Sequence, residues 1–439
     1  MVRTRVSASG LLGRFRPLLI AAAGLCLFAF LGLVALAYRP PIAEVMPPDP
    51  SRFPAALVAS GERLARIGNC LSCHQAAHGR PFAGGTAIRS AFGTIYGSNI
   101  TPDPDTGIGR WSQAAFIRAM REGVGRNGRQ LYPALPYDHF QYLTGGDLAA
   151  LYAFLMTRDP VKAIPPANRL IPPLGFRPVI AGWKLLFFRH DAAPAAVGAA
   201  DPAWARGRYL GEALAHCGGC HTPRNVFQAE ERSRAYTGGR SEGWYAPPIG
   251  AQSPAVRAWT VARLETYLRT GLSPSHAAAA GPMGAVAHNL SQVPVADVHA
   301  LAVYYASLMA QAPAGRREPT LPDREAEAAR AFPEGATLFA GACAACHGAG
   351  APMMVAGRPP LPLGTPLHEN NPRDTIQIIL QGLNPPVGAR GPYMPAFADS
   401  LSDGQVAAIV GYLRARYGTG PAWPDLPRAV AKARKEGER

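Results

Sequence analysis

The chain has 439 residues, of which 48% are hydrophobic and 17% are charged, and its formal net charge is +15. This length is enough for about three domains of ordinary size, and the composition excludes a mostly disordered chain. The basic residues are spread along the sequence and form no stripes interleaved with aromatic residues, so we expect no nucleic-acid partner.

The N-terminus carries four arginines, followed by an uncharged apolar segment at residues 18–38. Its length of roughly 20 residues fits a membrane-spanning helix and exceeds the apolar core of a cleaved signal peptide. Because positively charged flanks stay in the cytoplasm, residues 1–17 are expected to be cytoplasmic and everything after residue 38 to be exported. Ala35-Leu36-Ala37 resembles a cleavage site, so a removable signal is the alternative to an anchor.

A threefold internal repeat organises the rest of the chain. Each repeat begins with a short amphipathic helix that ends in Cys-x-x-Cys-His, at residues 61–74, 207–221 and 335–347. Each repeat also ends with a helix whose apolar residues recur at three- and four-residue spacing, which predicts one buried face. The three predicted faces are Leu148, Leu151, Phe154 and Leu155; Val298, Leu301, Tyr304 and Tyr305; and Val406, Ile409, Tyr412 and Leu413. The last of these helices should begin at Ser402, which forms a capping-box pattern with Gln405, and Thr144 with Asp147 is a weaker version.

These repeats predict three helical domains in series. We expect them at residues 50–160, 201–310 and 332–418, joined by Pro-rich linkers at 161–200 and 311–331 and followed by a basic tail at 419–439. The first linker contains the apolar run GWKLLFF, which is too short to span a bilayer. This run is either a docking segment or a buried part of the linker.

Each Cys-x-x-Cys-His motif has the spacing that covalent haem attachment requires. Two thiols add to the haem vinyl groups while the adjacent imidazole binds the iron. The thiols belong to Cys70, Cys73, Cys217, Cys220, Cys343 and Cys346, and the imidazoles to His74, His221 and His347. A zinc site would need two cysteine pairs in one place, and a thioredoxin-type pair would need a βαβ setting. The separate repeats favour three covalently bound haem c groups.

The second axial ligand of each iron is expected from the loop before the closing helix. Met283 in the second repeat and Met394 in the third occupy equivalent positions. A thioether there would stabilise ferrous iron and raise the potential. Met353 and Met354 follow the third motif too closely to reach the far face of its haem.

The first repeat departs from this pattern, because its equivalent position is Leu135, which has no lone pair to offer. We predict that His139, four residues further on, binds this iron and gives a bis-His haem of lower potential. A five-coordinate or water-bound iron, another ligand, and a simple hydrogen bond from His139 within the loop are the alternatives. The remaining histidines have no repeat-related position and are interpreted as ordinary.

Several stretches resemble the triple-haem cytochrome c subunits of bacterial membrane-bound dehydrogenases, the group that includes the partners of alcohol and gluconate dehydrogenases. The resemblance covers residues 50–418 and depends on GTIYGSNITPDPDTGIGRWS, ADPAWARGRYL, CHTPRN and the loops that hold Met283 and Met394. The alcohol-dehydrogenase branch has Met where this chain has Leu135. YPALPYDHF, LYAFLMTRDPV and FRPVIAGWKLLFF are closer to cytochromes paired with molybdenum hydroxylases that act on aldehydes or on N-heteroaromatics such as nicotinate.

The motifs and the resemblance together predict an all-α fold, with three tandem class I cytochrome c-like domains after one N-terminal transmembrane helix. The expected function is electron transfer from a catalytic dehydrogenase subunit, either a molybdopterin and iron–sulfur enzyme or a quinoprotein or flavoprotein, to quinone or a terminal oxidase. The expected location is the bacterial inner membrane, with the haem domains facing the periplasm. Substrate oxidation would belong to the partner, since no residue here is needed for acid–base or nucleophilic work. A haem peroxidase or a redox or gas sensor with an open first haem is the alternative.

Overall fold

The computed structural model describes residues 8–189, 201–310, 321–351, 359–385 and 391–437, with side chains from Pro17 onward. Met353 and Met354, together with parts of both predicted linkers, lie outside the described residues. Within the described ranges the regular structure is helical apart from five short strands. The all-α prediction did not foresee these strands.

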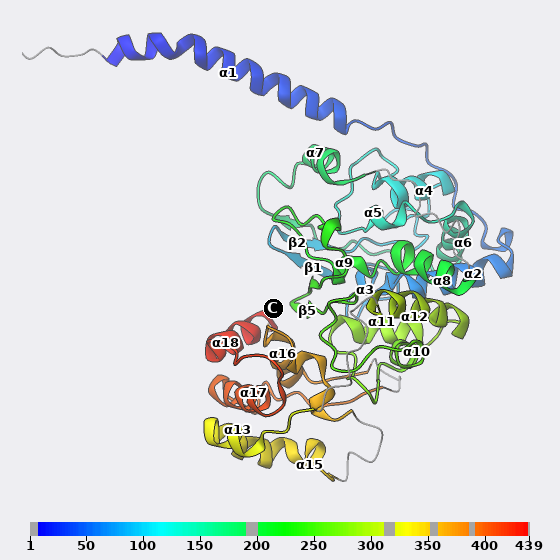
Figure 1. Ribbon diagram of the computed structural model, residues 1–439. Coiled ribbons are helices and arrows are strands. Elements are labelled where there is room, and N and C mark those ends of the chain that lie inside the picture. Colours follow the sequence, from blue (N-terminus) through cyan, green and yellow to red (C-terminus); the bar gives the residue numbers. More distant parts are fainter. Residues whose placement is uncertain (1–7, 190–200, 311–320, 352–358, 386–390, 438–439) are drawn as a thin grey trace, which may run out of the picture.

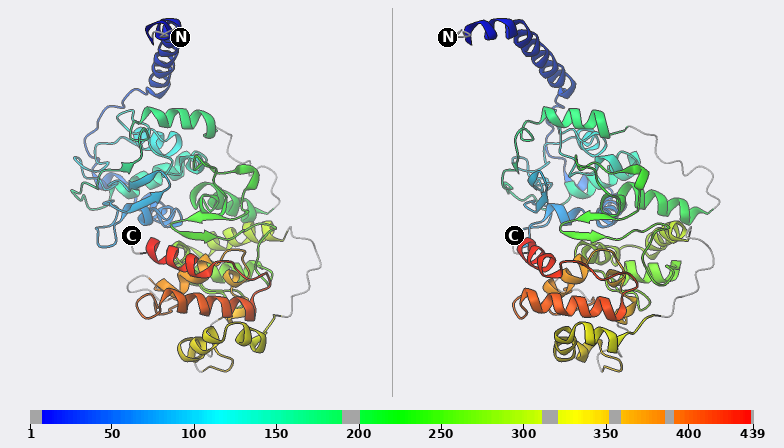
Figure 2. Two further views of the ribbon diagram at one scale, coloured as in Figure 1. Left: turned by 90° about the vertical axis from the view of Figure 1, so that its left-hand side faces the viewer. Right: turned by 60° about the vertical axis from the view of Figure 1, so that its left-hand side comes forward.

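The first helix, α1 (Ala8–Ala37), projects away from the rest of the molecule (Figures 1 and 2). Its segment Pro17–Ala37 is long and apolar enough to cross a membrane, and most of its side chains are exposed, whereas Ala37 at its end is buried. The predicted apolar helix at residues 18–38 is therefore present as one long helix.

The first repeat combines helices with a small antiparallel sheet. A 3-10 turn (Pro50–Arg52) precedes α2 (Ala55–Ile67), α3 (Cys70–His74), α4 (Gln113–Glu122), α5 (Tyr137–Phe140) and α6 (Gly145–Met156). The sheet has the order β1 (Ala87–Ser90), β2 (Gly93–Tyr96) and β3 (Arg169–Leu170). Because β3 belongs to the predicted linker, this part of the linker is paired to the first repeat through Thr94 and Arg169.

The second repeat follows α7 (Pro178–Phe187), which contains most of the apolar GWKLLFF run. Its elements are α8 (Pro202–Tyr209), a π-helical turn (Leu210–Leu214), α9 (Gly218–His221), a 3-10 turn (Arg232–Arg234), the hairpin of β4 (Gly239–Ser241) and β5 (Trp244–Ala246), α10 (Val261–Thr270), α11 (Pro282–Leu290) and α12 (Val295–Met309). The haem motif again ends the opening helical segment.

The third repeat also places its haem motif after an opening helix and a π-helical turn. Its elements are α13 (Glu325–Ala331), α14 (Pro333–Leu338), a π-helical turn (Phe339–Cys343), α15 (Ala344–His347), 3-10 turns at Leu361–Leu363 and Thr365–Leu367, α16 (Arg373–Gln381) and α17 (Asp403–Tyr417). A final helix, α18 (Leu426–Gly437), packs on α16 and α17 and accounts for most of the predicted basic tail.

The opening helix of each repeat crosses its closing helix at a glycine. The packed pairs are α2 with α6, α8 with α12, and α14 with α17. A Cβ atom added to Gly61, Gly207 or Gly335 would lie only 2.0, 1.9 or 2.2 Å from the carbonyl oxygen of Ala150, Ala300 or Ala408, respectively. Glycine is therefore required for this close approach of the two backbones.

The closing helices bury the faces that their sequence pattern predicts. All twelve predicted core side chains are buried, and none is more than 6% exposed. The capping box at the start of α17 forms as predicted, with the Ser402 hydroxyl accepting a hydrogen bond from the Gln405 amide and the Gln405 side chain accepting one from the Ser402 amide. The Thr144 hydroxyl caps α6 by accepting a hydrogen bond from the Asp147 amide.

The first two repeats share one hydrophobic core. It joins Leu64 and Leu151 of the first repeat to Leu210 and Leu301 of the second. Polar contacts reinforce the junction: Arg63 pairs with Asp297 at 3.6 Å, and the Tyr209 hydroxyl donates to Asp147 at 2.5 Å. The two repeats therefore form one packed unit.

The third repeat has a separate core, which includes Ile376, Val410 and Val430. Polar contacts with the β4–β5 hairpin help to join it to the second repeat. The Tyr245 amide donates to Asp374 at 2.9 Å, and the Arg373 side chain donates to the Gly243 carbonyl. Figure 1 shows this repeat at the far end of the body from α1.

Candidate functional site

All three Cys-x-x-Cys-His motifs line one connected cavity of ≈ 2880 Å³. Every predicted thiol and imidazole of the motifs is among its lining residues. A pocket for a single small molecule is about 300–1,000 Å³. The cavity therefore has room for several large cofactors, and its mainly apolar walls suit the faces of a macrocycle.

Two motif histidines are held in the orientation that iron binding requires. The Nδ1 atom of His74 lies 2.7 Å from the Ser98 carbonyl oxygen, and that of His221 lies 2.7 Å from the Pro247 carbonyl oxygen. A carbonyl oxygen only accepts, so each Nδ1 carries the proton and each Nε2 lone pair is left for a metal. Burial lowers the pKa of both imidazoles, which favours the neutral form that binds a metal.

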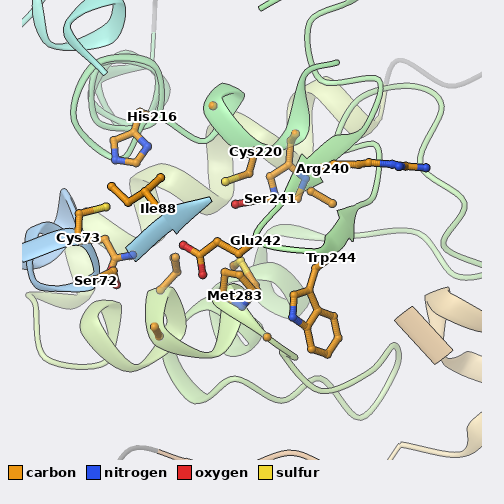
Figure 3. Close-up of a pocket in the computed structure, with 18 of the residues that line it drawn as sticks. Ser72, Cys73, Ile88, His216, Cys220, Arg240, Ser241, Glu242, Trp244 and Met283 are labelled. Carbon is orange, nitrogen blue, oxygen red and sulfur yellow. Dashed lines mark hydrogen bonds between the residues drawn. The ribbon is translucent and has the colours of Figure 1, made fainter. Parts of the chain in front are cut away.

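The thiols of the first and second motifs face the same part of the cavity. All six motif cysteines are unpaired. Burial, followed by the charges of Glu242 and Cys220, raises the pKa of Cys73 to about 11, so these groups lie near one another. Figure 3 shows the side chains of Cys73, Cys220 and Glu242 around the same part of the cavity. Cofactors attached at these two motifs would be close neighbours.

Both predicted methionine ligands line the cavity. Met283 lies near the start of α11. Met394 is held beside the end of α16 by two backbone hydrogen bonds with Leu383, each 2.9 Å long. The structure thus brings each methionine to the space lined by the histidine of its own repeat, and iron ligation by these side chains stays a prediction.

His139 faces the second repeat. Among the described residues Leu135 lines the cavity, whereas His139 is absent from its lining. Its Nδ1 lies 2.6 Å from the Glu212 carbonyl oxygen, and its Nε2 lies 3.0 Å from Glu230 Oε1. Ligation of the first iron by His139 stays a prediction, and it would require one of these two contacts to break.

His139 and Glu230 form a buried ion pair. Burial lowers the pKa of His139, but the charge and hydrogen bond of Glu230 outweigh this and raise it to about 9. Burial raises the pKa of Glu230, but the charge of His139 outweighs that and lowers it to about 2. Arg224 also contacts Glu230, at 3.3 Å. The pair therefore links α5 of the first repeat to the second by a charge-assisted contact.

Sequence reasoning missed two further polar side chains in the cavity wall. His216 directly precedes Cys217, its ring lies 5.7 Å from that of Phe140, and burial together with the charge of His139 lowers its pKa to about 4. Its position next to the motif was a signal visible in the sequence. Glu242 lies in the turn of the β4–β5 hairpin, and no sequence pattern pointed to it.

Two acidic residues line the cavity where the second and third repeats meet. Glu369 is 4% exposed, and neither of its carboxyl oxygens has a hydrogen-bond partner in the described part of the chain. Burial, and then the charge of Asp374, raises the pKa of Glu369 to about 9. Burial also raises the pKa of Asp374 to about 6, although the hydrogen bond from the Tyr245 amide opposes this. Glu369 is therefore uncharged at neutral pH.

Comparison with known proteins gives a consistent set of relatives. The family model described as cytochrome C oxidase, cbb3-type, subunit III matches residues 329–413. The chain is 41% identical to a nicotinate dehydrogenase subunit from Pseudomonas putida over 92% of this chain, but it spans only 34% of that protein. It is 37% identical to the gluconate 2-dehydrogenase cytochrome c subunit of Pantoea cypripedii, over 87% of this chain and 90% of the relative. A diheme cytochrome c-type protein of Cereibacter sphaeroides is 36% identical over 64% of this chain and 95% of its own length.

Proposed function

Because the chain belongs to the family of cytochrome c subunits of membrane dehydrogenase complexes, we propose that it carries electrons from a catalytic dehydrogenase subunit through three haem c groups to quinone or a terminal oxidase. The observation that carries this proposal is the opening of all three haem motifs onto one cavity. The relatives favour electron transfer over the peroxidase or sensor alternative.

The proposed attachment sites are the six motif cysteines, and the proposed proximal ligands are His74, His221 and His347. Met283 and Met394 would complete the second and third irons, which supports higher potentials there. His139 is the proposed sixth ligand of the first iron, and a five-coordinate or water-bound iron or another ligating residue is the alternative. When bound, haem supplies the one-electron chemistry, while the chain holds each group and sets its surroundings.

The proposed domains are residues 50–160, 201–310 and 332–418, each a class I cytochrome c-like unit. The recurring glycine at the helix crossing and the recurring buried face support this division. Supporting features of the third unit are its separate core and the family model that matches residues 329–413.

The proposed partner is a dehydrogenase of the molybdopterin and iron–sulfur type, with a quinoprotein or flavoprotein as the alternative. The 41% identity to a nicotinate dehydrogenase subunit supports a partner that oxidises an N-heteroaromatic compound or an aldehyde. Relatives named for gluconate, fructose and alcohol dehydrogenases support the alternative.

The proposed location is the bacterial inner membrane, with α1 as a retained anchor and the haem domains in the periplasm. The apolar length of Pro17–Ala37 supports the anchor.

The number of haems provides the direct test. The full chain is matured in a host that attaches haem c, and the haem content is measured by pyridine haemochrome absorbance and intact mass. We expect three haems per chain, and the loss of one haem when both cysteines of any single motif are changed to Ala. Cys26→Ala is the matched control, because Cys26 is an exposed cysteine of α1 outside the motifs. Fewer than three haems in the unaltered chain, or a motif variant that keeps all three, would contradict the proposal.

A further inference from the structure

Helix α7 is held firmly against the first repeat by its polar side chains. The Lys184 ammonium donates hydrogen bonds to the Glu122 carbonyl at 2.6 Å, to the Gly123 carbonyl at 2.8 Å and to Gln130 Oε1 at 2.8 Å. Arg177 donates to the Gln130 carbonyl at 2.9 Å. These bonds fix which side of α7 faces outward.

The outward side of α7 is apolar and continues onto neighbouring segments. Leu185 and Leu186 are 72% and 70% exposed, and Phe227 is 55% exposed. Phe227 joins α7 through its ring, 5.6 Å from that of Phe187, and through its carbonyl oxygen, which accepts a hydrogen bond from the Trp183 indole. Ile171 and Phe176, just before α7, are 52% and 42% exposed. We call Ile171, Phe176, Leu185, Leu186 and Phe227 the α7 surface.

The α7 surface is continuous with the membrane-length helix. The rings of Phe30 in α1 and Phe176 stack with their centroids 5.9 Å apart, and Leu33 of α1 lies against Gly182. Figures 1 and 2 show α7 as the part of the body directly beneath α1. At a rise of 1.5 Å per residue, Phe30 lies about 10 Å from the end of α1 at Ala37. That depth matches the 5–10 Å to which interfacial helices are buried.

Cations lie beside the α7 surface. Burial and then the charge of Arg39 lower the pKa of Lys184 to about 7, which places Arg39 close to α7. The pKa of Arg177 is lowered by burial and by Arg129 in the same way. Arg39 and Arg129 are exposed. An apolar face with exposed arginines nearby suits the boundary between acyl chains and anionic headgroups.

We propose that the α7 surface is embedded in the extracytoplasmic leaflet beside α1, so that the first repeat contacts the bilayer directly and is not joined to it by α1 alone. The occupant of this surface is lipid. The inference rests on the proposed function, because it takes α1 as a retained anchor. It also places Leu33 and Leu186, two residues that line the haem cavity, at the membrane boundary.

A nitroxide spin label at residue 186 tests this placement. The haem-loaded full chain carries Cys26→Ser and Leu186→Cys, so that the introduced thiol is the one available to the label, and it is reconstituted into vesicles of phosphatidylcholine and phosphatidylglycerol. The matched control is Val295→Cys, at a 47% exposed apolar residue of the second repeat. Accessibility to oxygen, which concentrates in acyl chains, is compared with accessibility to a water-soluble nickel chelate while the haems are reduced.

We expect the oxygen-to-nickel ratio at residue 186 to exceed that at residue 295 several-fold. A water-like ratio at residue 186 in chain that stays in the vesicles after carbonate washing would overturn the inference and leave the anchor intact. If the ratio at residue 186 is water-like in the chain alone, and the label becomes protected only when the purified dehydrogenase complex is reconstituted, the α7 surface would be assigned to the partner. That result would also overturn the inference. Loss of the chain from the vesicles on carbonate washing would instead refute the proposed anchor and the inference with it.

Discussion

Gly335 and Gly341 offer a matched pair for measuring how tightly the opening and closing helices of the third repeat are packed. A Cβ atom on Gly335 would lie 2.2 Å from the Ala408 carbonyl oxygen and 2.9 Å from Tyr412 Cβ, whereas one on Gly341 has nothing within 4 Å. Gly335→Ala must therefore push α14 away from α17, and overpacking of this kind costs about 1–3 kcal/mol. Gly341→Ala should stabilise by about 0.4–1 kcal/mol, because it reduces the freedom of the unfolded chain.

The two variants are compared as haem-loaded full chains by thermal unfolding, followed by far-ultraviolet circular dichroism and Soret absorbance. A loss of 1 kcal/mol lowers the midpoint of a unit of this size by about 4–8 °C. We expect Gly335→Ala to lower the midpoint of the third-repeat transition by about 4 °C or more and Gly341→Ala to leave it equal or higher. Equal midpoints for the two variants would refute the argument that the crossing requires glycine.

Three further predictions concern charged and ligating side chains. His139→Ala should lower the free energy of unfolding, measured by denaturant titration, by about 3 kcal/mol, because it leaves the buried Glu230 carboxylate without the positive charge of His139. In the same variant, an unchanged low-spin spectrum of the first haem would contradict ligation by His139. The unfolding free energy of the unaltered chain should fall as pH rises from about 4.5 to about 9, since the folded-state pKa of Glu369 lies above its unfolded value and its stabilising effect is lost over that interval. Glu369→Gln should flatten this slope. Parallel pH profiles of the unfolding free energy for the two proteins would contradict the assignment of the slope to Glu369. Met394→Leu should lower one of the three haem potentials in a spectroelectrochemical titration, since a thioether ligand raises the potential, and three unshifted potentials would exclude this ligand.

The local pattern of the sequence was enough to predict the helices that frame the site. The closing helices were found because 3–4 spacing of apolar residues requires one buried face, and the start of α17 was found because Ser402 and Gln405 satisfy each other's backbone. The prediction of a single opening helix that ends in the haem motif of the first repeat was less accurate. The helix stops at Ile67, and Asn69 takes a left-handed conformation (φ 52°) before the motif helix begins.

Contacts between distant segments could not be predicted in this way. Glu230 is 91 residues from His139 in the chain, and no periodic pattern indicates that the two meet. The strand at Arg169–Leu170 was assigned to a linker because two residues carry no alternation signal, yet it completes the sheet of the first repeat. The GWKLLFF run is buried in part, since Phe188 is buried while Leu185 and Leu186 are exposed, and docking of its exposed residues on another surface stays a prediction.

The common core of the first two repeats has a consequence for maturation if haem is attached as proposed. Attachment at Cys70 and Cys217 would then precede the closing of a single apolar interior, because both residues pack against it. A delay at either motif would then hold the other in an unfinished, protease-sensitive state. The third motif packs against a separate core, so haem attachment there and folding of the third repeat would be independent of the first two repeats.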